Sequence, residues 1–345
     1  MVMNKIRKRS EDIRHFILKN VEQHPVDIAA LTAQQFGISR QAVNKHIQQL
    51  VEQNAITVEG STKNRRYQLH PVTEWQKTYD LSGKLEEDTV WQHDIKPLLN
   101  ELPDNVRGIW YYGFTEMFNN AIEHSSAKQI LVCVSRKATT TEIIIHDDGE
   151  GIFRKIQREL DLSDERHAVL ELAKGKLTTD PSHHSGEGIF FTSRMFDHFT
   201  IISGGINFSH KYDEREDWIF ERQKPRVGTA VFIELDNNTA RTPKQIFDQF
   251  SVDEDYGFTK TVVPVRLAQY GDEMLISRSQ AKRLLARVDR FMVVVFDFTG
   301  VEAIGQAFAD EVFRVFKRQH PDIQLLATNA SQEVRRMISR AETHL

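Results

Sequence analysis

The amino-acid sequence predicts a multidomain α/β protein with three folded parts: an all-α head, an α/β sandwich in the middle and a small α/β domain at the C-terminus. Helical periodicity near the N-terminus, three glycine-containing acidic motifs in the centre and alternating strands and helices in the last third carry this prediction. A chain of 345 residues with 40% apolar composition can bury more than one core. We expect domains at 1–70, 85–236 and 259–345, with a linker at 71–84 and a connector at 237–258.

Composition narrows the class of protein. One cysteine, Cys133, excludes an intramolecular disulfide framework and fits a reducing cytoplasm. The first residues are charged but lack the apolar stretch of a signal peptide, and no run of eighteen apolar residues appears. We therefore expect a cytoplasmic protein without a membrane partner.

The net charge of −4 is unevenly distributed. Residues 1–69 carry eleven Lys or Arg against six Asp or Glu, a balance of +5, which leaves −9 for the rest of the chain. A basic end on an acidic protein is where a nucleic-acid contact is expected.

Helices are expected at 13–24, 27–36 and 40–53, with Gly37 in the turn and Ser39 as the cap of the third helix. The third helix places apolar side chains on one face and polar or basic ones on the other. Strands at 56–58 and 67–69 then bracket a hairpin tip. The side chains predicted to reach DNA are Arg40, Gln41, Asn44 and Lys45 of the third helix and Lys63, Arg65 and Arg66 of the tip.

This layout resembles a winged helix-turn-helix, and the resemblance implies a DNA partner for residues 1–70. The alternative from the residues alone is a small helical domain used for dimerisation or protein docking.

Three motifs follow in the centre: Glu116-Met-Phe-Asn-Asn120-Ala121, Asp147-Asp-Gly149-Glu-Gly151 and Gly186-Glu-Gly188-Ile-Phe. Residues 111–125 are expected to be helical, so Glu116 and Asn120 project from one face. An amide oxygen suits Mg²⁺ bound to phosphates, and a carboxylate one turn away can act as a general base. Without the other motifs, this would be interpreted as a solvated helix face.

The other two motifs complete the pattern. Asp147 ends an apolar run at 141–146 that is expected to be a buried strand, where its carboxylate can accept a hydrogen bond from an adenine amino group. Gly149 and Gly151 permit a tight turn and close approach of the base, although an ordinary Asp-Gly turn is the alternative. Gly186 and Gly188 precede an expected helix at 189–196, whose free N–H groups suit phosphate.

The ordered set resembles the GHKL superfamily of gyrase, the MutL repair proteins, histidine kinases and anti-sigma-factor serine kinases. The resemblance implies a Bergerat-type α/β sandwich that binds ATP with Mg²⁺. It assigns Glu116 as catalytic base, Asn120 as Mg²⁺ ligand, Asp147 as adenine ligand, and Thr229 with the four motif glycines to the nucleotide. Segment 152–185 would be the ATP lid; for its cations Lys174, Lys176, His183 and His184 a solvated position is favoured over a phosphate contact.

The last third predicts strands at 261–267, 274–276, 292–298 and 323–327, with helices at 279–288, 308–316 and 331–341. Phe296-Asp-Phe-Thr-Gly-Val301 and Phe308-Ala-Asp-Glu-Val-Phe313 resemble a STAS-like domain of unknown function. The loop at 302–307 lacks the phosphorylatable serine of STAS partners of anti-sigma kinases. Asp297 is expected to cap a strand end, and Asp310 and Glu311 to be solvated.

A histidine-kinase phosphoacceptor is not supported, because His93-Asp-Ile-Lys-Pro97 is one residue short of the expected box. The favoured hypothesis is a transcriptional regulator in which the nucleotide domain switches DNA binding. The alternative is an ATPase or a serine/threonine kinase acting on another protein. A third hypothesis is sequestration of a regulatory protein by the C-terminal domain. A homodimer is expected by analogy.

Overall fold

The computed structural model describes residues 2–61, 64–177, 186–213, 217–251, 257–269 and 274–343. The chain divides into two compact units. The first consists of residues 1–77 with 133–143 and 235–239; the second consists of 78–132, 144–234 and 240–345. The sequence predicts separate central and C-terminal domains, but both contribute to the second unit.

The N-terminal region is a three-helix bundle with a hairpin, so it is not all-α. Its elements are α1 (Val2–Asn20), α2 (Ile28–Phe36), α3 (Arg40–Glu52) and the antiparallel pair β1 (Ile56–Glu59) and β2 (Arg66–Leu69). Gly37 adopts φ 61° after α2, and the Ser39 hydroxyl accepts a hydrogen bond from the Ala42 N–H at 3.2 Å, which caps α3 as expected. The apolar faces of the three helices and the hairpin enclose one core.

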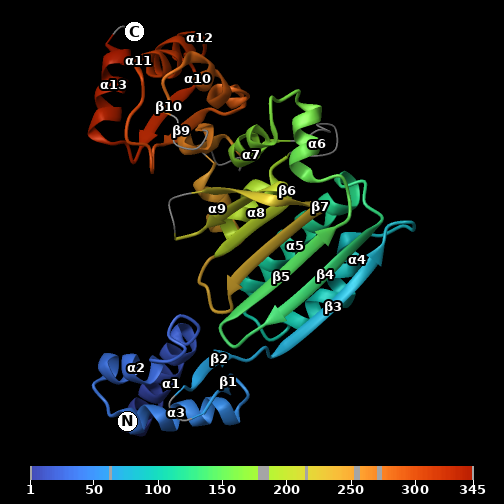
Figure 1. Ribbon diagram of the computed structural model, residues 1–345, viewed down its shortest axis with the longest axis vertical. Helices are drawn as coiled ribbons and strands as arrows, with labels where there is room; N and C mark the ends of the chain where they lie inside the picture. Colours follow the sequence, from blue (N-terminus) through green and yellow to red (C-terminus); the bar gives the residue numbers. More distant parts are fainter. Residues whose placement is uncertain are drawn as a thin grey trace. The chain divides into compact units, whose positions relative to one another are not determined.

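A five-stranded sheet forms the central layer (Figure 1). Its strand order is β3 (Thr73–Asp80), β4 (Gln129–Arg136), β5 (Thr140–Asp147), β7 (Trp218–Asp236) and β6 (His198–Lys211). The expected linker at 71–84 therefore contains an edge strand. Strand β3 is mostly exposed, so its polar residues resemble a linker in sequence.

Helix α5 (Asp104–His124) covers one face of this sheet and begins earlier than the sequence indicates (Figure 1). It buries apolar side chains including Trp110, Phe114 and Phe118. The preceding segment is helical, and the connector contains a helix that begins at Pro243. The remaining elements are α4 (Glu87–Val90), η1 (Trp91–Ile95), η2 (Lys96–Leu99), α6 (Ile152–Glu159), α7 (Glu165–Lys174), α8 (Gly188–Met195) and α9 (Pro243–Gln249).

The C-terminal region has a three-stranded parallel sheet of order β10 (Gln324–Thr328), β9 (Val293–Asp297) and β8 (Lys260–Pro264). Parallel strands need crossover connections, which helices supply here. They are α10 (Arg278–Leu285) with η4 (Val288–Arg290), then α11 (Gln306–Ala309), η5 (Asp310–Phe316) and α12 (Lys317–Gln319); α13 (Gln332–Glu342) follows β10.

Two expected strands differ in this region. The first ends at Pro264, and the next four residues form the 3₁₀ turn η3 (Val265–Ala268). Residues 274–276 form no strand; Leu275 makes a single bridge to Ile304. In the described ranges no helix is both long and apolar enough to cross a membrane.

The three C-terminal acids occupy different environments. Asp297 Oδ1 accepts hydrogen bonds from Thr299 and Asn329, which confirms the expected cap at a strand end. Asp310 pairs with Arg314 at 3.1 Å, and Glu311 is 9% exposed. The expectation that Asp310 and Glu311 are solvated was therefore wrong for both, because the Asp310 side chain is only 14% exposed and Glu311 is buried.

Candidate functional site

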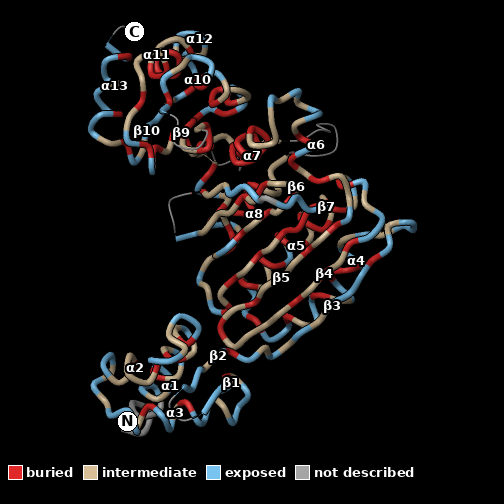
Figure 2. The backbone as a smooth tube through the Cα atoms, in the orientation of Figure 1, coloured by how far each residue is buried: buried red, intermediate tan, exposed pale blue. Residues whose placement is uncertain are grey.

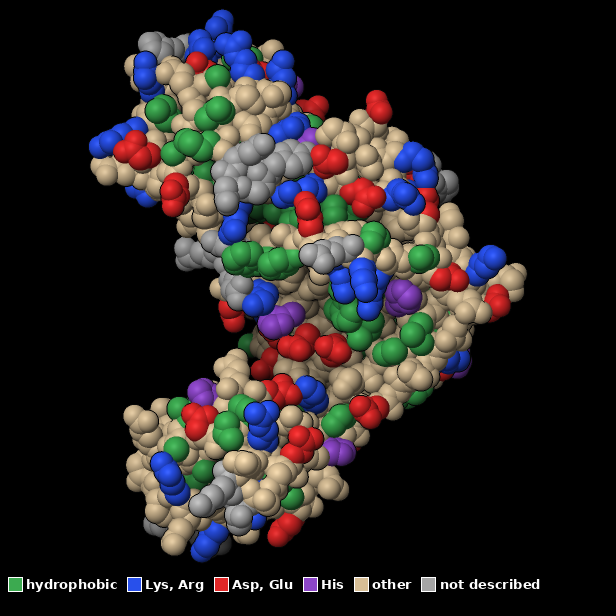
Figure 3. All heavy atoms as spheres, viewed as in Figure 1, with side chains coloured by type: hydrophobic (Ala, Val, Ile, Leu, Met, Phe, Trp, Pro, Cys, Tyr) green, Lys and Arg blue, Asp and Glu red, His purple; other side chains and the backbone are tan. Residues whose placement is uncertain are grey.

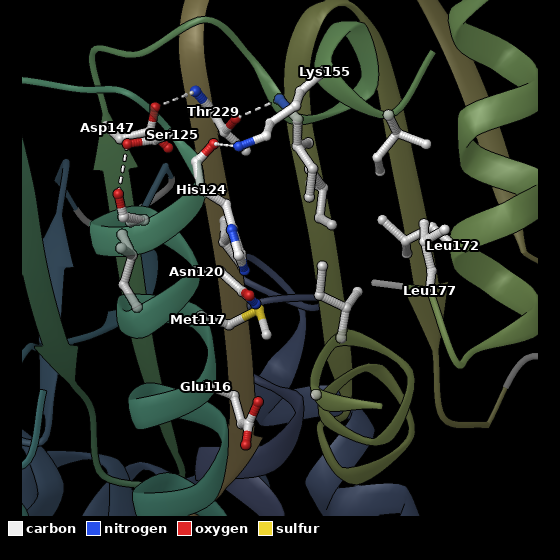
Figure 4. Close-up of a pocket in the computed structure, with 18 of the residues that line it drawn as sticks. Glu116, Met117, Asn120, His124, Ser125, Asp147, Lys155, Leu172, Leu177 and Thr229 are labelled. Carbon is white, nitrogen blue, oxygen red and sulfur yellow. Dashed lines mark hydrogen bonds between the residues drawn. The ribbon is translucent and has the colours of Figure 1, made fainter. Parts of the chain in front are cut away.

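A cavity of about 310 Å³ lies in the second unit between α5, the sheet and the segment that carries α6 and α7 (Figure 4). Its volume is in the range of small-molecule sites. Side chains from β5, β6 and β7 form an apolar wall that includes Ile145, Ile201 and Val231. Of the predicted nucleotide residues, Glu116, Asn120, Asp147, Gly186, Gly188 and Thr229 line this cavity.

Helix α5 contributes a stripe of polar side chains to the cavity. Glu116 and Asn120 are one turn apart on one face, as expected, and His124 continues the stripe by another turn (Figure 4). Met117 and Ala121 lie beside them and supply apolar contact. The stripe therefore orders a carboxylate, an amide and an imidazole along the length of the cavity.

Asp147 closes the end of the cavity at the last residue of β5. It is 4% exposed, and its Oδ1 accepts the N–H groups of Gly149 at 2.9 Å and Thr229 at 3.2 Å. Burial raises the pKa of this carboxyl group, and the two N–H donors partly offset the effect. No hydrogen bond from another described residue reaches Oδ2, so that oxygen can accept one from a ligand.

The adjacent Asp148 has a structural role. Its Oδ1 accepts the N–H groups of Lys128 at 2.8 Å and Gln129 at 3.0 Å, at the start of β4. These backbone donors lower the pKa of Asp148. Successive strand residues point to opposite faces, so only the first of the two aspartates can face the cavity.

The two glycines of the second motif lie in a tight turn beside the cavity. Gly149 and Gly151 are not among the residues that line the cavity. A methyl group on Gly149 would overlap the carbonyl of Ser125, at the C-terminal end of α5. Gly149 is thus required for close packing of the turn against α5, and the expectation that the two glycines let the base approach stays a prediction.

The third motif joins the start of α8 to the lid. Gly186 adopts φ 71°, and its carbonyl accepts the N–H of Leu177 at 3.0 Å. Leu172 and Leu177, on the lid, face the cavity opposite Asn120 (Figure 4). Residues 178–185 lie outside the described ranges, and His183 and His184 fall among them.

The lid lysines do not occupy the expected positions. Lys174 is 1% exposed, and its ammonium group bonds Glu171 Oε1 at 2.7 Å. Lys176 donates to the Arg290 carbonyl at 3.1 Å and lies over the Phe291 ring. The expectation of solvated lid cations was therefore wrong for Lys174, and neither lysine lines the cavity.

Lys155 is a cavity residue that the motifs do not indicate. Its ammonium group donates to the His124 carbonyl at 2.9 Å and lies 3.9 Å from Glu159 (Figure 4). It stands one turn into α6, whose N-cap is Gly151. Extending the helical spacing beyond the second motif would have found Lys155, and extending the α5 stripe would have found His124.

The N-terminal region exposes its predicted DNA contacts. In the part of the chain that is described, the side chains of α3 and the hairpin tip form no hydrogen bond or ion pair at Arg40, Gln41, Asn44, Lys45, Arg65 or Arg66, and all six are exposed. Lys63 lies outside the described residues. On the face in Figure 3, basic and acidic side chains of this region are interspersed.

A metal ion would need ligands beyond the protein. No group of three or more His, Cys, Asp or Glu side chains that could hold a metal occurs in the described ranges. Asn120, however, presents one hard oxygen ligand to the cavity, which fits an ion such as Mg²⁺ that is held mainly by phosphates and water.

Comparison with known proteins agrees with this geometry. Residues 93–207 match the histidine kinase-like ATPase domain, and residues 280–335 match a STAS-like domain of unknown function (DUF4325). The first match contains all three motifs and the lid; the second contains most of the C-terminal region. No match among curated proteins was found. The chain thus contains a GHKL-like ATPase domain, which supports a nucleotide-binding regulatory role, followed by a STAS-like domain.

Proposed function

We propose that this protein is an ATP-responsive regulator whose GHKL-like domain binds ATP with Mg²⁺ and whose N-terminal region binds DNA. The observation that carries the proposal is the single cavity in which Asp147, Asn120 and Glu116 are arranged in order along one wall. In the proposal, Asp147 Oδ2 accepts the adenine amino group, and the triphosphate extends along α5 toward Glu116.

In the proposal, different residues of the cavity bind different parts of the nucleotide. Apolar side chains from the sheet contact the adenine ring, Asn120 ligates the ion, and the N–H groups at the start of α8 receive phosphate oxygens. Bound Mg²⁺ would neutralise part of the negative charge of the phosphates. Leu172 and Leu177 exclude water from the side opposite α5.

The DNA-binding part of the proposal depends on α3. Its apolar side chains Val43, Ile47 and Leu50 are buried, and the opposite face exposes polar and basic groups. A helix of this kind beside a basic hairpin is suited to a DNA groove.

A second candidate function is phosphoryl transfer or ATP hydrolysis. Glu116 favours it, because a site that only senses ATP needs no carboxylate at the phosphate end. The loop at 302–307 has no hydroxyl side chain, so a kinase could not phosphorylate its own chain at this loop, and a separate protein is the proposed substrate.

One experiment tests ATP binding and separates the two candidates. Pure protein is incubated with γ-labelled ATP and Mg²⁺, and the label is followed into free phosphate and into protein, with a parallel ATP-binding isotherm. Wild type, Asp147→Asn and Glu116→Gln are compared. A switch binds ATP in wild type and in Glu116→Gln without turnover; an enzyme shows turnover that Glu116→Gln abolishes. Absence of ATP binding to wild type would refute both.

A further inference from the structure

The lid helix α7 is enclosed on all sides. Its residues from His167 to Lys174 are all buried, and Figure 2 shows the helix as nearly continuously red. Leu172 faces the ATP cavity, whereas Thr261 of β8 donates a hydrogen bond from its hydroxyl to the Lys174 carbonyl at 2.6 Å. One short helix therefore contacts both the cavity and the STAS-like region within the same compact unit.

Lys174 joins α7 to the end of α10. Its ammonium group donates to the carbonyls of Arg283 at 3.1 Å and Ala286 at 2.8 Å, besides its bond to Glu171. Carbonyls in the last turn of a helix lack partners within that helix, and a cation is favoured there. Lys174 thus supplies the C-terminal cap of a helix in the other domain.

The residues after Lys174 continue this attachment. The guanidinium groups of Arg287 and Arg290 donate to the Lys176 carbonyl at 3.3 and 3.1 Å, while Lys176 donates to the Arg290 carbonyl. Arg287 Nε also lies 3.7 Å from Glu171 Oε2. The lid is therefore fixed to the STAS-like domain up to one residue before Leu177, which lines the cavity.

An aromatic cluster links the same parts a second time. The Phe258 ring lies 4.6 Å from Phe190 and 4.9 Å from Phe191, both on α8. It also lies 5.2 Å from Phe291, which precedes β9. Helix α8 starts at Gly188 in the third motif, so the helix that follows the lid is packed onto the C-terminal region together with lid residues 171–177.

We propose that the STAS-like domain holds the lid segment 171–177 over the ATP cavity and so sets the rate at which nucleotide leaves. The inference rests on the proposed binding of ATP. Because coupling between two sites is reciprocal in binding free energy, any partner or ligand that shifts α10 changes nucleotide affinity, and bound nucleotide in turn shifts the equilibrium between the positions of α10.

Release of a fluorescent ATP analogue from the full-length chain tests the proposal. Lys174→Met removes the capping ammonium group, and the double variant Glu171→Gln with Lys174→Met does so without leaving a buried carboxylate unpaired. Lys282→Met, an exposed lysine on α10, is the matched control. We expect release at least about fivefold faster in both clamp variants, the lower end of typical coupling, and a change under about twofold in the control. Folded clamp variants that release the analogue at the wild-type rate would overturn the proposal.

Hydrogen exchange on wild type gives a test that needs no variant. ATP should slow amide exchange in peptides spanning 278–291 as well as in 165–177. Protection limited to 165–177 would show that bound nucleotide does not change amide exchange beyond the lid, and it would overturn the inference. If wild type binds no ATP, the proposed function itself fails, whereas ATP binding with unchanged release and exchange defeats this inference alone.

Discussion

Two adjacent carboxylates, Asp147 and Asp148, occupy different environments although they are one residue apart. Asp147 faces the cavity and is 4% exposed, whereas Asp148 ties the start of β4 through two backbone N–H groups. Burial raises the pKa of Asp147, so its charged form is held at a cost. Backbone hydrogen bonds lower the pKa of Asp148, so its charged form is favoured.

We expect Asp147→Asn to lose ATP affinity by roughly 10-fold or more, because an amide N–H₂ would then oppose the adenine amino group. Its unfolding free energy should stay equal or rise at pH 7. The amide oxygen can still accept both N–H groups, and no buried charge remains. Calorimetric titration and thermal melts measure the two effects.

Asp148→Asn is the matched control, with the reverse outcome: unchanged ATP affinity and a lower melting temperature. The two carboxylates should also differ in how their contributions to folding stability depend on pH. The pKa of Asp147 is higher in the folded than in the unfolded chain, so its contribution to stability decreases as pH rises from the unfolded toward the folded pKa. Equal loss of affinity in the two variants would contradict the assignment.

At the scale of elements, α3 combines a buried apolar face with an exposed face of Arg40, Gln41, Asn44 and Lys45. Ser39 caps its N-terminus, so those side chains extend from a fixed first turn. In the proposed function this face contacts DNA. The salt dependence of DNA binding is therefore expected to originate at its basic side chains.

We expect Lys45→Gln to reduce the slope of log affinity for DNA against log salt concentration by about 0.9, the value of one phosphate contact. Lys19→Gln, an exposed lysine on α1, should leave the slope unchanged. Fluorescence anisotropy across a salt series measures both. Identical slopes for the two variants would place the contact elsewhere than α3.

For the whole molecule, the proposed function requires communication between nucleotide and DNA. A useful switch needs a coupling free energy of about 1–3 kcal/mol. We therefore expect DNA affinity to change roughly 5- to 150-fold when ATP and Mg²⁺ are added, and the change to vanish in Asp147→Asn. Equal DNA binding with and without ATP, over a range of protein and salt concentrations, would leave a nucleotide-binding protein without a DNA switch.

The sequence was most informative where chemistry follows short-range spacing. Glu116 and Asn120 are one helical turn apart, and Asp147 ends an alternating strand, so their shared cavity follows from local periodicity and the order of the motifs. Thr229 lies 82 residues from Asp147, yet the resemblance located it.

Long-range packing was not predictable in the same way. The burial of Lys174 depends on carbonyls more than a hundred residues away, and a lysine in a polar lid gives no local sign of it. Likewise β3 is an edge strand with an exposed, polar sequence, so it was interpreted as a linker. In each case the deciding partner lies far along the chain.

Enclosure of α7 has a practical consequence for anyone who divides this chain into expression fragments. A fragment ending at residue 236 would keep the helix but lose Thr261, Phe258 and the carbonyls that Lys174 caps. The helix would then expose apolar side chains to solvent, and the Lys174 ammonium group would keep only Glu171 of the partners described here. We expect such a fragment to aggregate, whereas one that continues through 343 should remain monodisperse. The GHKL-like and STAS-like regions are packed together through α7, so a fragment boundary between them exposes side chains that are buried in the full-length chain.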